Sequence, residues 1–380
     1  MTRYILLLLA LFAPLTLAAD TLQAGVDPQG VVSGSWAHYK RTFIRDGRVT
    51  RPENGDDTVS EGQAYAMLRA VLMDDRTTFD QCLSWTDSNL SRLPASGDRL
   101  LKWHYRNSSS VDSAPASDAD IDYATGLVLA YRKWHDPRYL ELARGVLDSI
   151  LELETLRIDG RLYLLPWHVD SIPKGEPVPQ NPSYYAPAQF RLFYETTGDK
   201  RWKELVGTSY RILDDLQASF GGVDGSGLVP DWCMVTSEGA IIPMPGKNTF
   251  YGWEAVRAPL RIAADWLVNR DRRALRVLRR FAACFDRAYD SEGKLCSTYD
   301  YRCKGQDSRE NPLFYASAFI AGQATGSERA PEMLARLRGF LHEESDGFSY
   351  LNGRDYYVNS LCWLAEYYQV IQLQDQKKHD

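Results

Sequence analysis

Similar segments recur along this chain of 380 residues, and their repetition constrains the fold more than any other feature. Each segment starts with a polar or turn-forming residue and continues with an aromatic residue, small residues and an apolar helical stretch. The six segments begin at Ser60, Asp120, Asn181, Tyr251, Asn311 and Tyr356. Between them lie amphipathic stretches with helical periodicity, such as 139–153, 202–216 and 273–285. Six units of inner and outer helix, each of roughly 45–70 residues, predict an all-α fold, an (α/α)6 barrel.

The N-terminal ends of the inner helices crowd one mouth of such a barrel, so side chains in their first turns converge on one cavity. Repeat position places five side chains there: Glu61, Asp118, Asp120, Tyr184 and Glu254. Asn181 and Asn311, each followed by Pro, are favourable helix starts because Asn caps a helix and Pro suits its first turn. Strand-like alternation is confined to short stretches such as 161–169 and 228–242.

The first residues have the order of a secretory signal peptide. A positive charge at Arg3 precedes an apolar run over 4–17, and small residues follow before Asp20. The run is too short to span a membrane comfortably, so we interpret residues 1–19 as a removed signal peptide and expect no membrane insertion. No linker or charge block divides residues 20–380, which predicts a single domain in the periplasm or outside the cell.

Composition excludes several classes of protein. The net charge is −6 and Lys and Arg are scattered, which disfavours binding to nucleic acid or anionic membranes. Aromatic residues make up 12% of the chain, which fits a large core or a groove that stacks on sugar rings. The sequence has no GxSxG elbow, no Walker loop, no GxGxxG and no HExxH, so we expect neither a metal nor an organic cofactor.

Six cysteines permit disulfides in an exported protein, but their spacing leaves fifteen possible connectivities. Cys82, Cys284 and Cys362 lie in helical patterns, where buried thiols are ordinary. Cys296 and Cys303 bracket a short loop and are the preferred pair.

Glycoside hydrolysis requires two carboxyl groups on opposite sides of a bound sugar, one to give a proton and one to activate water or attack. Glu61 and Glu254 occupy equivalent places in different repeats, so they are expected to face each other across the mouth. Ordinary structural roles also fit. The residues 58–61 read as a capping box, Asp118 lies where first-turn acids belong, and Glu254 precedes Arg257 by three positions, as in a surface ion pair.

Four segments of the chain are similar to those of a known family. Residues 116–134 closely resemble the signature of glycoside hydrolase family 8, and residues 60–68 resemble the segment that carries its catalytic acid. Residues 181–187 and 229–232 resemble two further segments, and the matches run in order from about Trp36 to the final helix. The resemblance implies an inverting enzyme with an (α/α)6 barrel, the same fold that the repeats predict.

The resemblance also implies roles for individual residues. Glu61 would be the general acid, and Asp118 would hold and help to distort the sugar at the cleavage point. Tyr184 would line the same subsite, Trp103 would be a stacking platform, and Arg257 would orient the base. The predicted substrate-binding set also includes Tyr185, Asp120 and Trp232.

The chain departs from the family pattern at the base. The family segment usually reads aromatic-Asp-Ala-x-Arg, whereas residues 253–257 read Trp-Glu-Ala-Val-Arg. Glu254 therefore stands where Asp is expected, and we keep it as the predicted base. The alternative carboxylates are Asp120, Asp122 and Asp231.

These features predict an exported, inverting endo-β-1,4-glycanase, and specifically an endoglucanase acting on a β-1,4-glucan. The short, signal-bearing form is similar to the periplasmic cellulases that accompany bacterial cellulose synthesis, so the expected partners are a polysaccharide substrate and a neighbouring synthase complex. Two alternatives stay open. One is hydrolysis of another exopolysaccharide, xylan or chitosan on the same fold; the other is a non-catalytic glycan-binding protein with a degenerate base.

Overall fold

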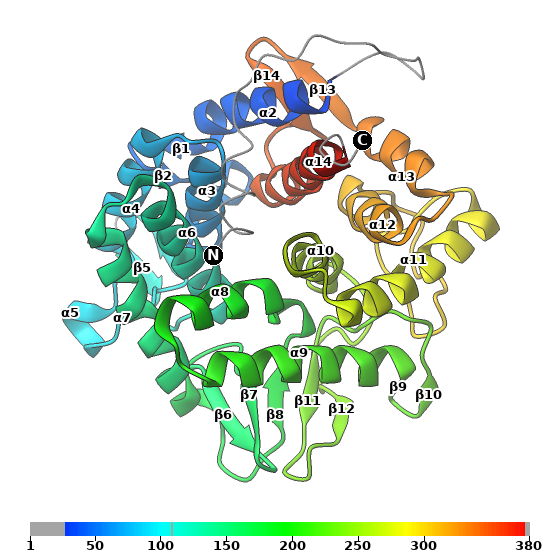
Figure 1. Ribbon diagram of the computed structural model, residues 1–380, viewed down its shortest axis with the longest axis horizontal. Helices are drawn as coiled ribbons and strands as arrows, with labels where there is room; N and C mark the ends of the chain where they lie inside the picture. The colour runs from blue at the N-terminus through cyan, green and yellow to red at the C-terminus, as the bar shows by residue number, and fades with distance from the viewer. Residues whose placement is uncertain (1–26, 108, 377–380) are drawn as a thin grey trace.

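A ring of paired helices forms the body of the protein (Figure 1). The computed structural model describes residues 27–107 and 109–376; the predicted signal peptide lies outside these ranges. Six helices line the inside of the ring: α3 (Ser60–Leu72), α6 (Ser117–Trp134), α8 (Pro187–Thr197), α10 (Ala258–Asn269), α12 (Pro312–Thr325) and α14 (Tyr356–Gln376). Six more alternate with them on the outside: α2 (Pro28–Phe43), α4 (Arg76–Asn89), α7 (Pro137–Leu153), α9 (Arg201–Ala218), α11 (Arg272–Glu292) and α13 (Ala330–Arg338). The predicted (α/α)6 barrel is confirmed.

Inner and outer helices differ in how they are buried. In α12 every residue of 312–322 is buried, because this helix is enclosed by its neighbours in the ring. In α11 the buried residues fall on one stripe, which includes Val277, Phe281 and Cys284, while the opposite face is rich in arginine. A solvated outer helix needs only one apolar stripe, and this explains why the amphipathic periodicity was strongest in the outer helices.

Short strands and turns occupy the connections between helices. The single-turn helix α5 (Leu93–Ser96) and the 3-10 turns η1 (Pro52–Asn54), η2 (Val169–Ser171), η3 (Pro182–Tyr184) and η4 (Ala255–Arg257) lie there. The two-stranded sheets are β1 (Ile44–Arg45) with β2 (Arg48–Val49), β6 (Thr155–Ile158) with β7 (Arg161–Leu164), β9 (Ser219–Phe220) with β10 (Val223–Asp224), and β13 (Leu341–Glu344) with β14 (Gly347–Tyr350). The three-stranded sheets are β3 (Thr58–Val59), β4 (His104–Arg106) and β5 (Ser109–Asp112), and β8 (Val178–Gln180), β11 (Cys233–Val235) and β12 (Ile241–Pro243).

The two three-stranded sheets lead directly into the predicted site. In one, β3 ends where α3 begins, and Val59 pairs with His104 in an antiparallel register. In the other, β8 precedes η3, and Gln180 pairs with Cys233. The sheets therefore fix how the chain enters the first turns at one mouth of the barrel.

Most helix starts agree with the sequence, with one shift. The Asn311 side chain accepts a hydrogen bond from the Leu313 N–H and caps α12 as predicted. Asn181 caps in the same way, but its proline opens only the 3-10 turn η3, and α8 begins at Pro187. The reason is that Tyr185 has extended backbone angles, which interrupt the helix after one turn.

The last inner helix closes the ring against the first elements of the chain. The Trp363 indole N–H of α14 donates to the Val32 carbonyl of α2 at 2.9 Å. Arg69 of α3 lies over the rings of Tyr39 and Trp363, and it donates to the Asn359 carbonyl at 3.3 Å. Within the described ranges, no helix is long and apolar enough to cross a membrane.

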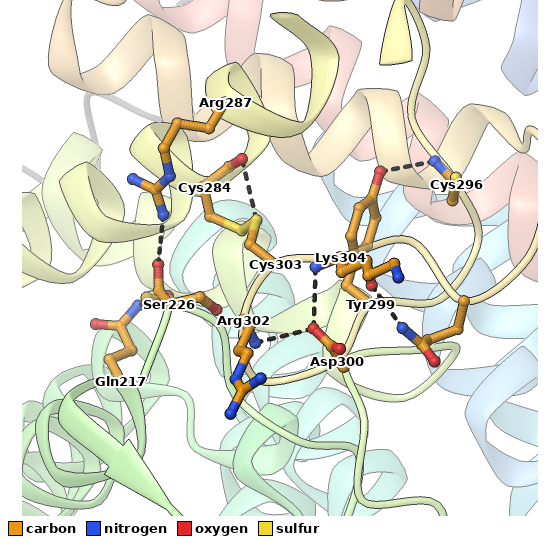
Figure 2. The surroundings of a disulfide bond; sticks show 12 residues. Gln217, Ser226, Cys284, Arg287, Cys296, Tyr299, Asp300, Arg302, Cys303 and Lys304 are labelled. Atoms are coloured by element: carbon orange, nitrogen blue, oxygen red, sulfur yellow. Dashed lines mark hydrogen bonds between the residues drawn. A yellow bond between two sulfur atoms is a disulfide. The ribbon is translucent and has the colours of Figure 1, made fainter. Parts of the chain in front are cut away.

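The disulfide joins a different pair from the one preferred on spacing. Cys284 of α11 is bonded to Cys303, with 5.9 Å between the two Cα atoms (Figure 2). Cys303 ends a tight turn with a positive φ of 65°, and this conformation presents its side chain to α11. Cys296 is a buried free thiol that donates to a Glu292 oxygen at 3.1 Å. The preference for Cys296 was wrong because sequence spacing does not show which helix the loop folds against.

Loss of this disulfide is expected to destabilise the protein. Replacing Cys284 and Cys303 by Ser should lower the free energy of unfolding by about 2–4 kcal/mol, because the open loop gives the unfolded chain more freedom. Thermal unfolding with and without a reductant measures this effect. Wild type should lose stability on reduction, and the double variant should be insensitive to the reductant. Cys296→Ser is the matched control and should respond to reductant as wild type does; insensitivity in that control would contradict the assignment.

Candidate active site

One buried arginine joins three carboxylates from three different repeats. Arg257 Nη1 donates to Glu61 Oε2 and to Asp118 Oδ2, both at 2.7 Å, and Nη2 donates to Glu254 Oε2. Only 3% of the arginine side chain is exposed. The three carboxylates predicted from positions far apart in the chain therefore meet at the mouth of the barrel, around a single guanidinium.

Glu61 has the environment of a carboxyl group that holds its proton. It lies in the first turn of α3, and 18% of its side chain is exposed. Burial raises its pKa to about 7, although the charge of Arg257 acts in the opposite direction. The Tyr356 hydroxyl donates to Glu61 Oε1 at 2.5 Å. The alternative role in a capping box is wrong: α3 has no side-chain cap, and the Thr58 hydroxyl donates to the Val49 carbonyl instead.

Asp118 lies in the first turn of α6 and is almost fully buried. Burial raises its pKa, and the Arg257 guanidinium counteracts the shift. Its second oxygen, Oδ1, accepts a hydrogen bond from the Ala119 N–H at 2.9 Å, which fixes the side chain against its own helix. The group is therefore held in one orientation beside Glu61.

Glu254 is the most exposed of the three carboxylates, with 36% of its side chain accessible. Its Oε2 also accepts a hydrogen bond from the Asn181 side chain at 3.0 Å. Glu61 and Glu254 contact different nitrogens of the guanidinium, so the two groups are held apart instead of in hydrogen-bond contact. The pair of Glu254 and Arg257 is present as the three-residue spacing indicated, but it lies at the buried cluster and not on the outer surface.

Asp231 supports the turn that carries Glu254. Its Oδ1 accepts hydrogen bonds from the N–H groups of Gly252, Glu254 and Ala255, at 2.9, 3.1 and 2.7 Å. Its Oδ2 accepts one from the Asn248 side chain at 2.6 Å. A Cβ at position 252 would lie 2.7 Å from Asp231 Oδ2, so this close approach requires glycine. Because both oxygens are engaged with the protein, Asp231 positions Glu254 and is a poor candidate for the base.

The other two alternative carboxylates lie inside the barrel. Asp122 is 1% exposed; it is paired with Arg261 at 2.8 Å and accepts from Gln189 at 2.6 Å. Asp120 is fully buried, and its Oδ1 accepts from the Leu101 N–H at 2.8 Å. The prediction that Asp120 contacts substrate is therefore corrected, because solvent does not reach this carboxyl group.

Aromatic side chains surround the cluster, although not all the predicted ones do so. The Tyr184 ring lies 5.1 Å from the Arg257 guanidinium carbon, and the Trp232 ring lies 6.2 Å from that of Tyr184. Trp103 is half-buried, and its carbonyl accepts from the Ser60 N–H at 3.0 Å, next to Glu61. Tyr185 is only 1% exposed and its hydroxyl donates to Gln180, so its predicted contact with substrate is corrected to a role in the core.

Three residues of the site were missed. Tyr356 donates to Glu61, Asn181 donates to Glu254, and Trp253 is 40% exposed beside the cluster. All three lie within or beside repeat segments, and this shared position was the signal available in the sequence. The described residues contain no group of three or more His, Cys, Asp or Glu side chains arranged to hold a metal ion.

The chain belongs to the family described as Glycosyl hydrolases family 8, whose sequence model matches residues 4–306. An endoglucanase from Cellulomonas uda is 30% identical over 240 residues, which is 62% of this chain and 64% of that protein. Endoglucanase A from Acetivibrio thermocellus is 30% identical over 260 residues, or 64% of this chain and 50% of that protein. The chain thus spans less than two thirds of the length of either relative.

A solved structure shows the same fold. The endo-β-1,4-glucanase from Acetobacter xylinum is 23% identical and superposes with a TM-score of 0.72, covering 91% of this chain and 100% of that one. The ring of paired helices is therefore the fold of this family, as the repeats predicted.

Proposed function

We propose that this protein is an inverting endo-β-1,4-glucanase. The observation that carries the proposal is the pair of carboxylates, Glu61 and Glu254, held at different nitrogens of Arg257 in the mouth of the barrel. An inverting enzyme needs its two carboxyl groups about 6.5–9.5 Å apart, with room for water between the sugar and the base. The names of the Cellulomonas and Acetivibrio relatives support a glucan as substrate.

The acid step falls to Glu61. Its raised pKa keeps a proton on the carboxyl group near neutral pH, and this proton passes to the glycosidic oxygen as the bond from C1 to that oxygen breaks. The Tyr356 hydroxyl and Arg257 then stabilise the carboxylate that remains. The sugar whose C1 reacts is held by Asp118 and Tyr184, both of which contact Arg257.

The base step falls to Glu254. It takes a proton from a water molecule whose oxygen attacks C1 from the face opposite the leaving group, so the configuration inverts. Arg257 and Asn181 orient the Glu254 carboxylate, and Asp231 fixes the turn beneath it. The half-buried Trp103 and the exposed Trp253 provide ring faces for neighbouring sugars, whereas Trp232 is 9% exposed and packs against Tyr184.

The alkaline limb of the pH profile should report the acid. Since Glu61 must be protonated to act and its pKa is raised to about 7, we expect kcat/KM to fall tenfold per pH unit above about pH 7. The measurement is kcat/KM on a soluble glucan from pH 5 to 9, with thermal unfolding at each pH to show that the protein stays folded. A profile that stays flat through pH 9 would contradict the assignment of Glu61.

The experiment that tests the function is reducing-end release from carboxymethyl-cellulose, mixed-linkage glucan, xylan and chitosan, with proton NMR of the first products. Cleavage of the glucans with initial release of the α-anomer supports the proposal. Cleavage of xylan or chitosan alone would keep the mechanism and replace the substrate. Binding to these polysaccharides without any cleavage would instead establish the alternative, a glycan-binding protein.

We further propose that the protein is exported and acts beside a polysaccharide synthase complex in the cell envelope. The signal-peptide pattern of residues 1–19 and the single catalytic domain support this location. Cell fractionation of the full chain, compared with a chain lacking residues 2–19, tests it: the full chain should leave the cytoplasm and the truncated chain should stay there.

A further inference from the structure

Two carboxyl groups lie fully buried behind the catalytic cluster, and the mechanism does not use them. Asp120 is in the first turn of α6, Glu154 follows the end of α7, and both have an exposed fraction of 0%. Of their four side-chain oxygens, only Asp120 Oδ1 receives a hydrogen bond, from the Leu101 N–H at 2.8 Å. Asp120 Oδ2 and both oxygens of Glu154 have no donor among the described residues. Buried polar atoms of this kind need an explanation.

Among the described residues, no Lys or Arg side chain donates a hydrogen bond to either carboxyl group. The positive charge of Arg92 acts on Glu154, but Arg92 is itself bound to Asp98 at 2.9 and 3.0 Å. Asp118 and Asp98 add negative charge near the pair. Arg99 adds positive charge near the adjacent Tyr123, whose hydroxyl donates to Asp87. Two ionised carboxylates at this place would repel each other in a low-dielectric interior.

The two side chains are within hydrogen-bonding reach of each other. Two carboxyl groups form a hydrogen bond only when one of them carries a proton, because two carboxylates offer four acceptors and no donor. Burial raises the pKa of Asp120 well above its ordinary value, and burial together with the nearby Asp120 charge does the same for Glu154. A shared proton gives Asp120 Oδ2 and one Glu154 oxygen a partner each, which leaves one Glu154 oxygen without a donor among the described residues.

We propose that Asp120 and Glu154 share one proton and act as a positioning pair that holds the Leu101–Trp103 segment against the catalytic helices. The catalytic part of this inference rests on the proposed function. The Asp120 carboxylate fixes the Leu101 N–H, and two residues later the Trp103 carbonyl accepts from the Ser60 N–H at 3.0 Å, next to Glu61.

The main chain at Glu154 is also connected to the start of α6 by backbone hydrogen bonds. The Glu154 carbonyl accepts from the Leu165 N–H at 2.8 Å, and the Pro166 carbonyl accepts from the Ser117 N–H at 3.2 Å, next to Asp118. Glu61 and Asp118 thus each follow a residue, Ser60 or Ser117, whose N–H is bonded to a segment that also contacts Asp120 or Glu154.

The variant Glu154→Gln tests whether Asp120 and Glu154 share a proton. The Gln amide donates to the Asp120 carboxylate and keeps the hydrogen bond, but it has no proton to lose. Folding of the wild type takes up a proton. The stability contributed by this proton is fully present below the unfolded pKa of about 4, and it is lost as pH rises through the folded pKa of the pair. We expect the wild-type Tm to fall more steeply than that of the variant between pH 5 and 9, by roughly 2 °C per pH unit.

The matched control is Glu366→Gln. Glu366 is also 0% exposed, but Arg338 pairs with it at 2.9 and 2.7 Å, so its charge is compensated. This control should lower Tm at every pH and keep the wild-type slope. Parallel Tm curves for wild type and Glu154→Gln would overturn the shared proton, whether or not the protein cleaves any glycan.

Positioning is tested with Asp120→Ala and Asp120→Asn. The Asn side chain retains an acceptor for the Leu101 N–H and a donor for Glu154, whereas Ala has neither. Amide hydrogen exchange at Leu101 and Ser60 should accelerate at least tenfold in the Ala variant and stay close to wild type in the Asn variant. On a cleaved glucan, kcat/KM at pH 6 should fall by about 100-fold in the Ala variant and by less than threefold in the Asn variant.

Unchanged exchange at Ser60 in Asp120→Ala would overturn the positioning role, and so would full kcat/KM in a variant that is folded at the assay temperature. If Asp120→Ala does not fold, wild-type exchange and activity in Asp120→Asn and Glu154→Gln still support the pair, and loss in either of them counts against it. Absence of cleavage by the wild type would overturn the proposed function alone, because unfolding and exchange do not depend on substrate.

Discussion

Replacing Glu61 by Gln is expected to lower kcat on a soluble β-glucan by about 10²–10⁴-fold. The amide has nearly the shape of the carboxyl group, and it can still contact Tyr356 and Arg257 at the positions where Glu61 is held. It has no proton to give to the leaving oxygen, so the C1–oxygen bond would break without protonation. Initial rates of reducing-end release measure the loss, and calorimetry with a cello-oligosaccharide measures binding, which should stay within a few-fold of wild type.

The control for this variant is Glu332→Gln. Glu332 is another first-turn glutamate, but it lies on the outer helix α13 and pairs with Arg329 at 2.8 Å. Its kcat should equal that of the wild type. Wild-type kcat in Glu61→Gln would remove Glu61 from the mechanism and return it to a structural role.

Replacing Glu254 by Gln is expected to lower kcat by a similar factor, about 10²–10⁴-fold, because the attacking water would lose its base. The more informative change is Glu254→Asp, which restores the residue type of the family pattern. Its turn is fixed by Asp231, so the shorter side chain would draw the carboxylate back from Asn181 and from its place at Arg257. Misplacement by about 1 Å costs roughly 100-fold in rate, and we expect a loss of that size.

The two Glu254 variants separate two explanations of the unusual residue. If the backbone of this chain is adapted to Glu, both variants are poor catalysts, and both keep the wild-type Tm to within a few degrees. If Glu254→Asp is as active as the wild type or more active, the length of the Glu254 side chain does not determine where the base must lie. Activity retained in Glu254→Gln would assign the base to another group. The anomer formed first, measured by proton NMR, should be the α-anomer in wild type.

The fold was predictable because each repeat carries its own local signal. The stripe of apolar residues in α11 and the Asn-Pro start of α12 identify helices without any knowledge of neighbours. The start of α8 was not predictable in the same way. The Asn-Pro signal at Asn181 is identical to that at Asn311, but the extended backbone of Tyr185 ends the turn, and this conformation is set by tertiary packing around a fully buried ring.

The site was predictable to the extent that repeat position determines it. Glu61 and Asp118 lie in the first turns of α3 and α6, Glu254 precedes the turn η4 that leads into α10, and the ring brings these positions together. Which oxygen meets which partner depends on contacts across the ring, and the sequence does not encode these locally. Tyr356 was therefore missed, because it lies 295 positions from Glu61 in the chain. In the folded protein its hydroxyl donates directly to Glu61. For the same reason, Tyr185 was predicted to contact substrate, whereas its side chain is buried in the core.

The closing contact between α14 and the first elements of the chain has a consequence for the order of assembly. Glu61 belongs to the first inner helix and Tyr356 to the last, so the hydrogen bond that orients the acid forms only when the two ends of the ring meet. Trp363, which is on the same helix as Tyr356, donates from its indole N–H to the Val32 carbonyl of α2. A chain that is still emerging from a ribosome or a translocon already contains all three carboxylates. Their side chains do not yet have the arrangement that they have in the closed ring. The hydrogen bond between Tyr356 and Glu61 therefore requires the last inner helix to be in place.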